Sequence, residues 1–301
     1  MTVSFRPAEY VRPRTVEEAS ALLADFGGQG AVIAGGTDLL VKKPAHVKAL
    51  IDLVDLRLDH IVTDGSSEGA ENGESTGNGR ALRIGASVTV TDLAEAHHAL
   101  SGPWSMITEA ARLLGTPAVR NRATLGGNLC NASPAGDLSV ALLALRAYAV
   151  TSGTSGVRRI PLSEFFLGPN RTVLAVDEVL MEIGVPATPA GSGAAFLKLG
   201  RHQSSVDIAT VSVGCLLVAD HGVCRDVRIS LGAVGPTPVL THAPTEALVG
   251  REFSPALMRE AGAIAAADVH PIDDVRASAV YRRKMTAVLV RRALETALRE
   301  V

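Results

Sequence analysis

One stretch of nineteen residues, from Val119 to Asp137, constrains the fold and function of this chain more than any other. It lies between two segments with helical patterns, yet few of its side chains are large and apolar. At its centre is Gly126-Gly127, and a glycine pair lets the backbone approach a ligand closely and reach a positive φ without steric cost. Short polar side chains around this pair can bond to nearby backbone or to a bound polar molecule: Thr124, Asn128, Asn131, Ser133 and Asp137.

An apolar helix is predicted to begin near Leu138, with the residues from Ser133 to Asp137 as its cap. A helix N-terminus preceded by free N–H groups suits a phosphate. A long structural loop is the alternative for a single Gly-Gly pair. The five small polar residues favour a ligand site.

A second turn of small residues follows a short apolar strand predicted over 31–34. It reads Gly35-Gly36-Thr37-Asp38, and consecutive N–H groups in such a turn can form a nest for an anion. The turn lacks the Gly-x-Gly-x-x-Gly dinucleotide fingerprint, and no Gly-Lys-Ser/Thr follows to make a P-loop. Alone it is more typical of a tight structural turn. Two such turns in one domain predict a ligand with two phosphates, held from both sides.

Length and composition exclude several classes of protein. The chain has 301 residues, enough for two or three domains. A net charge of −2 argues against a general role at nucleic acids or membrane surfaces, and 3% aromatic residues argue against a base-stacking platform. Three scattered cysteines support neither a disulfide framework nor a metal or iron–sulfur site. No signal pattern or membrane-length apolar run is present, which predicts a cytoplasmic protein.

The pattern of the chain changes near residue 176. Before it, apolar strands alternate with helices, interrupted at 64–80 by a polar segment predicted to be a flexible hairpin tip or insertion. After it, three alternating strands are predicted at 178–185, 209–219 and 226–233, followed by helices at about 255–267 and 277–300. This order predicts a small α+β domain with a sheet on one side and helices on the other.

Two charged clusters lie in the second part. Lys198, Arg201 and His202 form a basic cluster for which a solvated loop and a functional role are equally open. Asp273 or Asp274 is predicted to cap the last helix, with Arg276 and Arg282 as ion-pair partners, either for structure or for a subunit contact.

Several of these segments together resemble the flavoprotein (medium) subunit of the molybdenum hydroxylases, a family that includes xanthine dehydrogenase, molybdenum-type carbon monoxide dehydrogenase and 4-hydroxybenzoyl-CoA reductase. The resemblance covers nearly the whole chain, and its specific part is the order and spacing of the two glycine motifs. The segments that carry it are Ala34–Asp38, Val119–Asn121, Thr124–Asn128 with Asp137, Lys198–Arg201, Asp207–Ala209, Arg276–Ser278 and Tyr281-Arg282.

This resemblance implies an α+β fold in two parts. Residues 1–176 would form a PCMH-type FAD-binding domain of two α/β subdomains, about 1–55 and 56–176. Residues 177–301 would form a domain like the C-terminal domain of the carbon monoxide dehydrogenase flavoprotein, with a three-stranded antiparallel sheet and helices.

The resemblance also implies which residues hold FAD between the two subdomains. The diphosphate would be held by Ile33, Ala34, Gly35, Gly36, Thr37, Asp38, Leu39, Thr124, Gly126, Gly127 and Asn128. Asp137 would bond the ribityl or adenosine portion, and Leu180 would pack on the adenine. Lys198 would approach the flavin ring, where a cation stabilises the anionic reduced form. Ile208 would cover one face of that ring.

The implied function is electron transfer within a complex. A small [2Fe-2S] subunit would pass electrons from a large molybdenum-cofactor subunit to this FAD, which would hand them to NAD⁺, oxygen or another acceptor. No side chain of this chain need act as an acid or base, because the flavin supplies the chemistry. The cysteine-bearing insertion of the benzoyl-CoA reductase branch is absent. A stand-alone FAD-dependent oxidase or reductase on a related fold, such as the enolpyruvyl-glucosamine reductases, is the alternative, and a flavin-free scaffold is a third reading.

Overall fold

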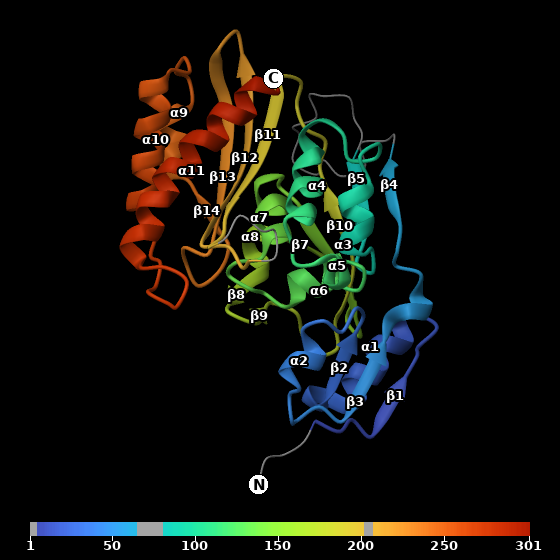
Figure 1. Ribbon diagram of the computed structural model, residues 1–301. Coiled ribbons are helices and arrows are strands. Elements are labelled where there is room, and N and C mark those ends of the chain that lie inside the picture. The colour runs from blue at the N-terminus through green and yellow to red at the C-terminus, as the bar shows by residue number, and fades with distance from the viewer. Residues whose placement is uncertain (1–4, 65–80, 202–206) are drawn as a thin grey trace.

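A computed structural model describes residues 5–64, 81–201 and 207–301 (Figure 1). The described residues form three larger sheets, of three, five and four strands, each with helices against it, and one two-stranded sheet. The segment expected to be a polar hairpin tip lies outside the described residues from residue 65 onward. His202 also lies outside them.

The N-terminal sheet is parallel and has the order β1-β3-β2. Its strands are β1 (Glu9–Val11), β2 (Gly30–Ile33) and β3 (Ala49–Asp52), and helix α1 (Val16–Phe26) packs on it through buried Ala19 and Leu23. Thr15 caps α1 by accepting from the Glu18 N–H at 3.1 Å. The Glu18 carboxylate accepts from the backbone N–H of Arg14 instead of Thr15, so only half of a capping box forms.

The middle sheet has the order β4-β5-β10-β6-β7, and each neighbouring pair is antiparallel. Its helices enclose the largest apolar core, in which every residue of α7 is buried. The elements are β4 (Ile61–Asp64), β5 (Ala81–Gly85), α3 (Val90–Glu95), α4 (Ser105–Arg112), α7 (Asp137–Ala144), β6 (Tyr148–Gly153), β7 (Gly156–Pro161) and β10 (Val179–Val185).

Strand β10 lies at the centre of this middle sheet, between β5 and β6. Placing 178–185 in the C-terminal sheet is therefore wrong. Ile183 and Val185 are fully buried in the middle core, and a sequence pattern does not say which sheet a strand will join. The hydrogen bonds of β10 favour a division of the chain after Val185 instead of at 176.

The C-terminal sheet is antiparallel with four strands instead of three: β11 (Ser192–Leu199), β12 (Val211–Asp220), β13 (Val223–Gly232) and β14 (Val239–Thr241). Helices α10 (Pro255–Ala267) and α11 (Ala279–Arg299) pack together beside the sheet, as expected, and the short α9 (Ala243–Leu248) packs against α10 (Figure 1). Helix α7 of the middle domain contacts β12 and β13. There the Ser230 hydroxyl donates to the Val140 carbonyl at 2.6 Å.

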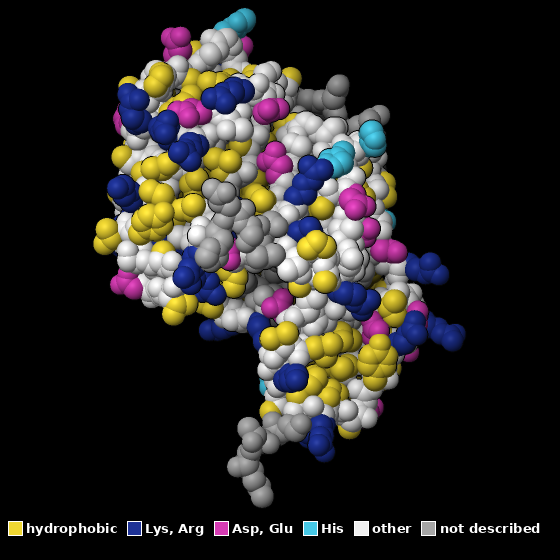
Figure 2. Space-filling model, viewed as in Figure 1, with side chains coloured by type: hydrophobic (Ala, Val, Ile, Leu, Met, Phe, Trp, Pro, Cys, Tyr) yellow, Lys and Arg dark blue, Asp and Glu magenta, His cyan; other side chains and the backbone are white. Residues whose placement is uncertain are grey.

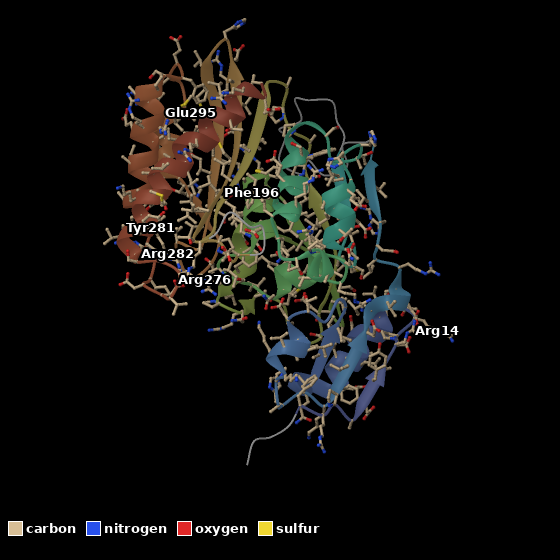
Figure 3. All side chains as sticks on the ribbon, viewed as in Figure 1. Arg14, Phe196, Arg276, Tyr281, Arg282 and Glu295 are labelled. Atoms are coloured by element: carbon tan, nitrogen blue, oxygen red, sulfur yellow. The ribbon has the colours of Figure 1, made fainter. Side chains whose placement is uncertain are left out.

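Arg282 anchors the start of α11 inside the C-terminal domain. It donates to the carbonyls of Thr210 at 2.6 Å and Ala233 at 3.0 Å, and pairs with Asp274 at 2.7 Å. Arg276 and Tyr281 lie next to it at the same end of α11 (Figure 3). The expected pairing of Asp274 with both arginines is confirmed, and it supports the structural reading. The expected N-cap residue is wrong: Ser278 is the N-cap of α11 and accepts from the Tyr281 N–H at 3.2 Å.

The remaining elements are short. Between β3 and β4 the chain forms η2 (Leu53–Leu56), and Arg57 adopts a φ of 53° that breaks an extended chain. The other short elements are η1 (Gly27–Gln29), α2 (Leu39–Lys42), η3 (Gly102–Trp104), α5 (Pro117–Arg120), α6 (Leu125–Cys130), α8 (Leu162–Phe165), β8 (Phe166–Gly168) and β9 (Arg171–Thr172).

Lysine and arginine side chains are scattered over the visible face, and no element gathers them into one broad basic patch (Figure 2). None of the helices in the described parts of the chain has the length and apolar character needed to cross a membrane.

Candidate functional site

A cavity of about 430 Å³ lies where the N-terminal sheet meets the middle domain. This volume is within the range of small-molecule and cofactor sites. Three stretches of the chain supply most of its lining, at 32–42, 119–131 and 174–180. Twelve of the fifteen residues that the resemblance assigned to FAD line it: Ile33, Ala34, Gly35, Gly36, Thr37, Asp38, Leu39, Thr124, Gly126, Gly127, Asn128 and Leu180.

The first glycine turn connects the end of β2 to α2, as the sequence predicts. Gly36 has a φ of 71°, which an L side chain rarely adopts. Within the described parts of the chain, nothing accepts a hydrogen bond from the backbone N–H groups of residues 35–38. A row of free N–H groups in a cavity wall is an anion-binding nest. The turn is therefore suited to a phosphate.

Gly35 is also the point at which the two glycine motifs meet. A Cβ atom added there would lie 1.8 Å from the carbonyl oxygen of Arg122 and 3.1 Å from Cα of Ala123. Both neighbours are backbone atoms, which cannot move aside independently. Only glycine permits this contact, and the contact fixes one wall of the cavity against the other.

The second glycine motif differs from its expected form, because Gly126 and Gly127 lie inside helix α6 without a positive φ. The N–H groups at its start are already used: Leu125 donates to Val88, Gly126 donates to Ala86, and Gly127 donates to the Thr124 hydroxyl. Gly126 is needed for a close approach, since an added Cβ would lie 2.8 Å from Cβ of Ala86. This motif supplies a smooth surface to the cavity, and the first turn supplies the free N–H groups.

The expected side-chain cap of α7 does not form. Gly136 is the N-cap residue, and the Ser133 hydroxyl accepts from the Ala135 N–H at 3.3 Å. Asp137 is the first residue of the helix, where the dipole favours a negative charge.

Asp137 and Lys198 do not line the cavity but pair with each other. The Lys198 Nζ lies 2.6 Å from Oδ2 of Asp137 and 2.7 Å from the Leu113 carbonyl oxygen, and both side chains are 6% exposed. Burial raises the pKa of Asp137 to about 6, although Lys198 acts to lower it. The charge of Lys198 is thus already matched by a carboxylate. Ile208 is about half exposed and is also absent from the lining.

Oδ1 of Asn128 is a buried polar atom of the cavity wall, and it has no hydrogen-bond partner within the described residues. It is an acceptor, and a hydroxyl group of FAD is a donor that would satisfy it. Oδ1 of Asp137 also lacks a partner, but Asp137 lies outside the cavity lining. With the nest at 35–38, the Asn128 acceptor makes the site fit a nucleotide with a diphosphate.

Residues that the sequence did not single out complete the cavity wall. Glu178 pairs with Arg158 at 2.5 Å, and the hydrogen bond from Arg158 holds the pKa of Glu178 below its usual value. Lys42 and Asn170 lie at the rim. Lys42 comes one helical turn after the nest. The spacing of this basic residue from the glycine turn is the one sequence signal that could have identified Lys42 as a site residue.

The site is built to bind and not to transfer protons. Its ionisable lining residues are Asp38, Lys42, Cys130 and the paired Glu178. The described residues contain no group of three or more His, Cys, Asp or Glu side chains that could hold a metal ion.

Comparison with known proteins agrees with this geometry. The family described as "FAD binding domain in molybdopterin dehydrogenase" matches residues 4–188, and "CO dehydrogenase flavoprotein C-terminal domain" matches residues 194–297. The carbon monoxide dehydrogenase medium chain of Hydrogenophaga pseudoflava is 32% identical and covers 96% of both chains. The xanthine dehydrogenase FAD-binding subunit of Escherichia coli O157:H7 is 28% identical over 97% of this chain and 96% of its own length.

A solved structure of carbon monoxide dehydrogenase from Hydrogenophaga pseudoflava contains a chain that superposes with a TM-score of 0.88 at 32% identity, covering 98% of each chain. A chain of reconstituted carbon monoxide dehydrogenase from Oligotropha carboxidovorans gives 0.88 at 29% identity, covering 98% of this chain and 99% of its own. The two-part fold, the cavity between glycine motifs and these matches lead to one conclusion. The chain belongs to the family of FAD-binding oxidoreductase subunits of the molybdenum hydroxylases, and its cofactor is FAD.

Proposed function

We propose that this chain is an electron relay, passing electrons from the [2Fe-2S] clusters of a small partner subunit through FAD to an acceptor. A large molybdenum-cofactor subunit would complete the assembly. The observation that carries the proposal is the cavity itself: it has a diphosphate nest at 35–38 and lacks a base placed over a substrate. Relatives named as medium chains or FAD subunits, matched along their whole length, support it.

Each part of the site has a distinct task in this proposal. The N–H groups of residues 35–38 hold the diphosphate, and Asn128 accepts from a hydroxyl group of the cofactor. Leu180, which is 5% exposed at the cavity wall, packs against the adenine. When bound, FAD supplies reversible electron transfer.

The acceptor is NAD⁺, oxygen or another oxidant, and a cytoplasmic location stays a prediction. The proposal is tested by expressing the chain with and without a candidate small [2Fe-2S] subunit and a candidate large molybdenum-cofactor subunit. A relay co-purifies with both subunits, and its flavin is reduced when the substrate of the molybdenum subunit is added to the complex. A chain that purifies alone with FAD and oxidises a substrate by itself would instead support the stand-alone oxidoreductase.

A further inference from the structure

The ammonium group of Lys42 stands at the rim of the cavity without a counter-charge. Its Nζ donates to Oδ1 of Asn131 and to Oδ1 of Asn170, and both acceptors are neutral amides. No carboxylate of the described residues lies within ion-pair distance of it. Lys42 is also the only lysine or arginine among the lining residues. The positive charge of Lys42 is therefore available to pair with a bound anion.

The two amides are held by an unusual backbone arrangement. Asn170, in the turn between β8 and β9, has a φ of 57°, and its N–H donates to the Ala132 carbonyl at 3.1 Å. Ala132 is buried and has a φ of 46°. Left-handed non-glycine residues are uncommon and persist where the surrounding structure holds them. Asn131 directly precedes Ala132, so both acceptors of Lys42 are fixed by the same strained rim.

The position of Lys42 relative to the nest is fixed by helix α2. The Lys42 N–H donates to the Asp38 carbonyl at 2.8 Å, so Lys42 lies one turn after the free N–H groups of residues 35–38. An ammonium group has three N–H donors, and two of them are used. The third remains for a ligand oxygen. Of the other charged lining residues, Glu178 is neutralised by Arg158 and Asp38 is itself negative, so Lys42 is the one cation available to a diphosphate.

We propose that Lys42 binds the cofactor, donating its remaining N–H to a diphosphate oxygen, with Asn131 and Asn170 as its positioning residues. This rests on the assignment of FAD to the cavity and identifies a charged contact beyond the glycine motifs. The nest contributes partial charges from the backbone, whereas Lys42 contributes a full charge. Binding through Lys42 is therefore sensitive to ionic strength.

The test uses the full chain freed of flavin, with Lys42→Gln and the control Lys43→Gln. Lys43 carries the same charge one residue away but does not line the cavity. Dissociation constants are measured by titration for FAD, for ADP, and for adenosine as a ligand without phosphate. Lys42→Gln is expected to weaken FAD and ADP roughly five- to thirtyfold, as for a charge-assisted hydrogen bond. In Lys42→Gln the dissociation constant for adenosine should change less than about twofold. In Lys43→Gln the dissociation constants for FAD and ADP should likewise change less than about twofold.

A second variant distinguishes phosphate binding by Lys42 from a purely structural role, in which its hydrogen bonds only hold α2 against the rim. Asn131→Ala with Asn170→Gly keeps the charge of Lys42 but frees it, and glycine tolerates the φ at 170. If Lys42 binds phosphate, the double variant should lose less affinity than Lys42→Gln, only for FAD and ADP, and the loss should be smaller at high salt. If Lys42 only holds α2 to the rim, both variants should lose the same affinity for all three ligands, adenosine included, and that result overturns the proposal.

Two other outcomes are distinguishable. Unchanged FAD and ADP affinities in Lys42→Gln refute the role of Lys42 and leave the FAD assignment intact. A wild-type chain that binds FAD neither alone nor with its partner subunits refutes the FAD assignment itself, and the role of Lys42 with it.

Discussion

Replacing Gly35 by alanine tests the claim that contact between the two glycine motifs shapes the cavity. The new Cβ would lie 1.8 Å from the Arg122 carbonyl oxygen, whereas an ordinary carbon–oxygen contact is about 3.3 Å. The two backbones must therefore separate by about 1.5 Å. The Arg122 carbon and Ala123 Cα, at 2.6 and 3.1 Å, close the other directions of escape.

Two consequences follow from this separation. Overpacking of this size costs about 1–3 kcal/mol of unfolding free energy. FAD affinity should be affected more strongly than stability. A separation of more than about 1 Å between the two backbones removes the alignment of the nest with the opposite wall of the cavity. We expect FAD affinity to fall by about 100-fold or more, the equivalent of about 2.8 kcal/mol.

The measurements are urea unfolding of the flavin-free chain and FAD titration of the same preparation. Gly28→Ala is the matched control, since Gly28 has no positive φ and an added Cβ would meet nothing within 4 Å. That variant should change stability by less than about 0.5 kcal/mol and leave FAD binding intact. A Gly35→Ala chain that binds FAD as tightly as the wild type would refute the reasoning.

Three further predictions concern buried charges. Lys198→Met should lower the unfolding free energy by about 3–5 kcal/mol, because it leaves the Asp137 carboxylate buried without its cation; a loss below 1 kcal/mol in urea unfolding would contradict this. Since the folded pKa of Asp137 is about 6 and its ordinary value is 3.8, its contribution to stability is complete below pH 3.8 and is lost as pH rises through 6. The unfolding free energy of the wild type relative to Asp137→Asn should therefore fall between pH 4 and 6, by at most about 1.4 kcal/mol per pH unit, and a rise over that window would be the wrong sign. Arg282→Met should cost about 2–4 kcal/mol, because it removes one of the two arginines paired with Asp274 and leaves the carbonyls of Thr210 and Ala233 without this donor, while exposed Arg292→Met should cost less than about 0.5 kcal/mol; equal thermal shifts in the two variants would count against the anchoring role.

Local patterns predicted the helices of the C-terminal domain well. The helix expected at 255–267 is α10, with Ser254 as its N-cap. The helix expected at about 277–300 is α11, with Ser278 as its N-cap. In both cases the capping residue directly precedes the helix, so the local sequence contains the signal that sets its start.

Long-range choices were not predictable in the same way. The pattern of residues 178–185 is that of a strand, yet only the packing of Ile183 into the middle core decides which sheet it joins. Strand β11 lies in a segment for which no strand was predicted, and it contains Lys198, whose burial depends on Asp137, 61 residues away in the chain. The form of the second glycine motif likewise depends on carbonyls of residues 86 and 88, which occupy the N–H groups of α6.

The cavity shows the same division between what is local and what is not. The nest at 35–38 follows from a short glycine turn after a strand and was predicted. Asn170 and Glu178 lie outside the glycine motifs, and only the fold brings them to the same cavity as Lys42.

The most direct test of the central claim is the absorption spectrum of the purified chain, followed by release and identification of any flavin. The cavity and its nest predict flavin bands and, on denaturation, release of FAD and not FMN, close to one per chain when the partner subunits are present. A colourless chain that cannot be reconstituted with FAD, even beside its partners, would contradict the account.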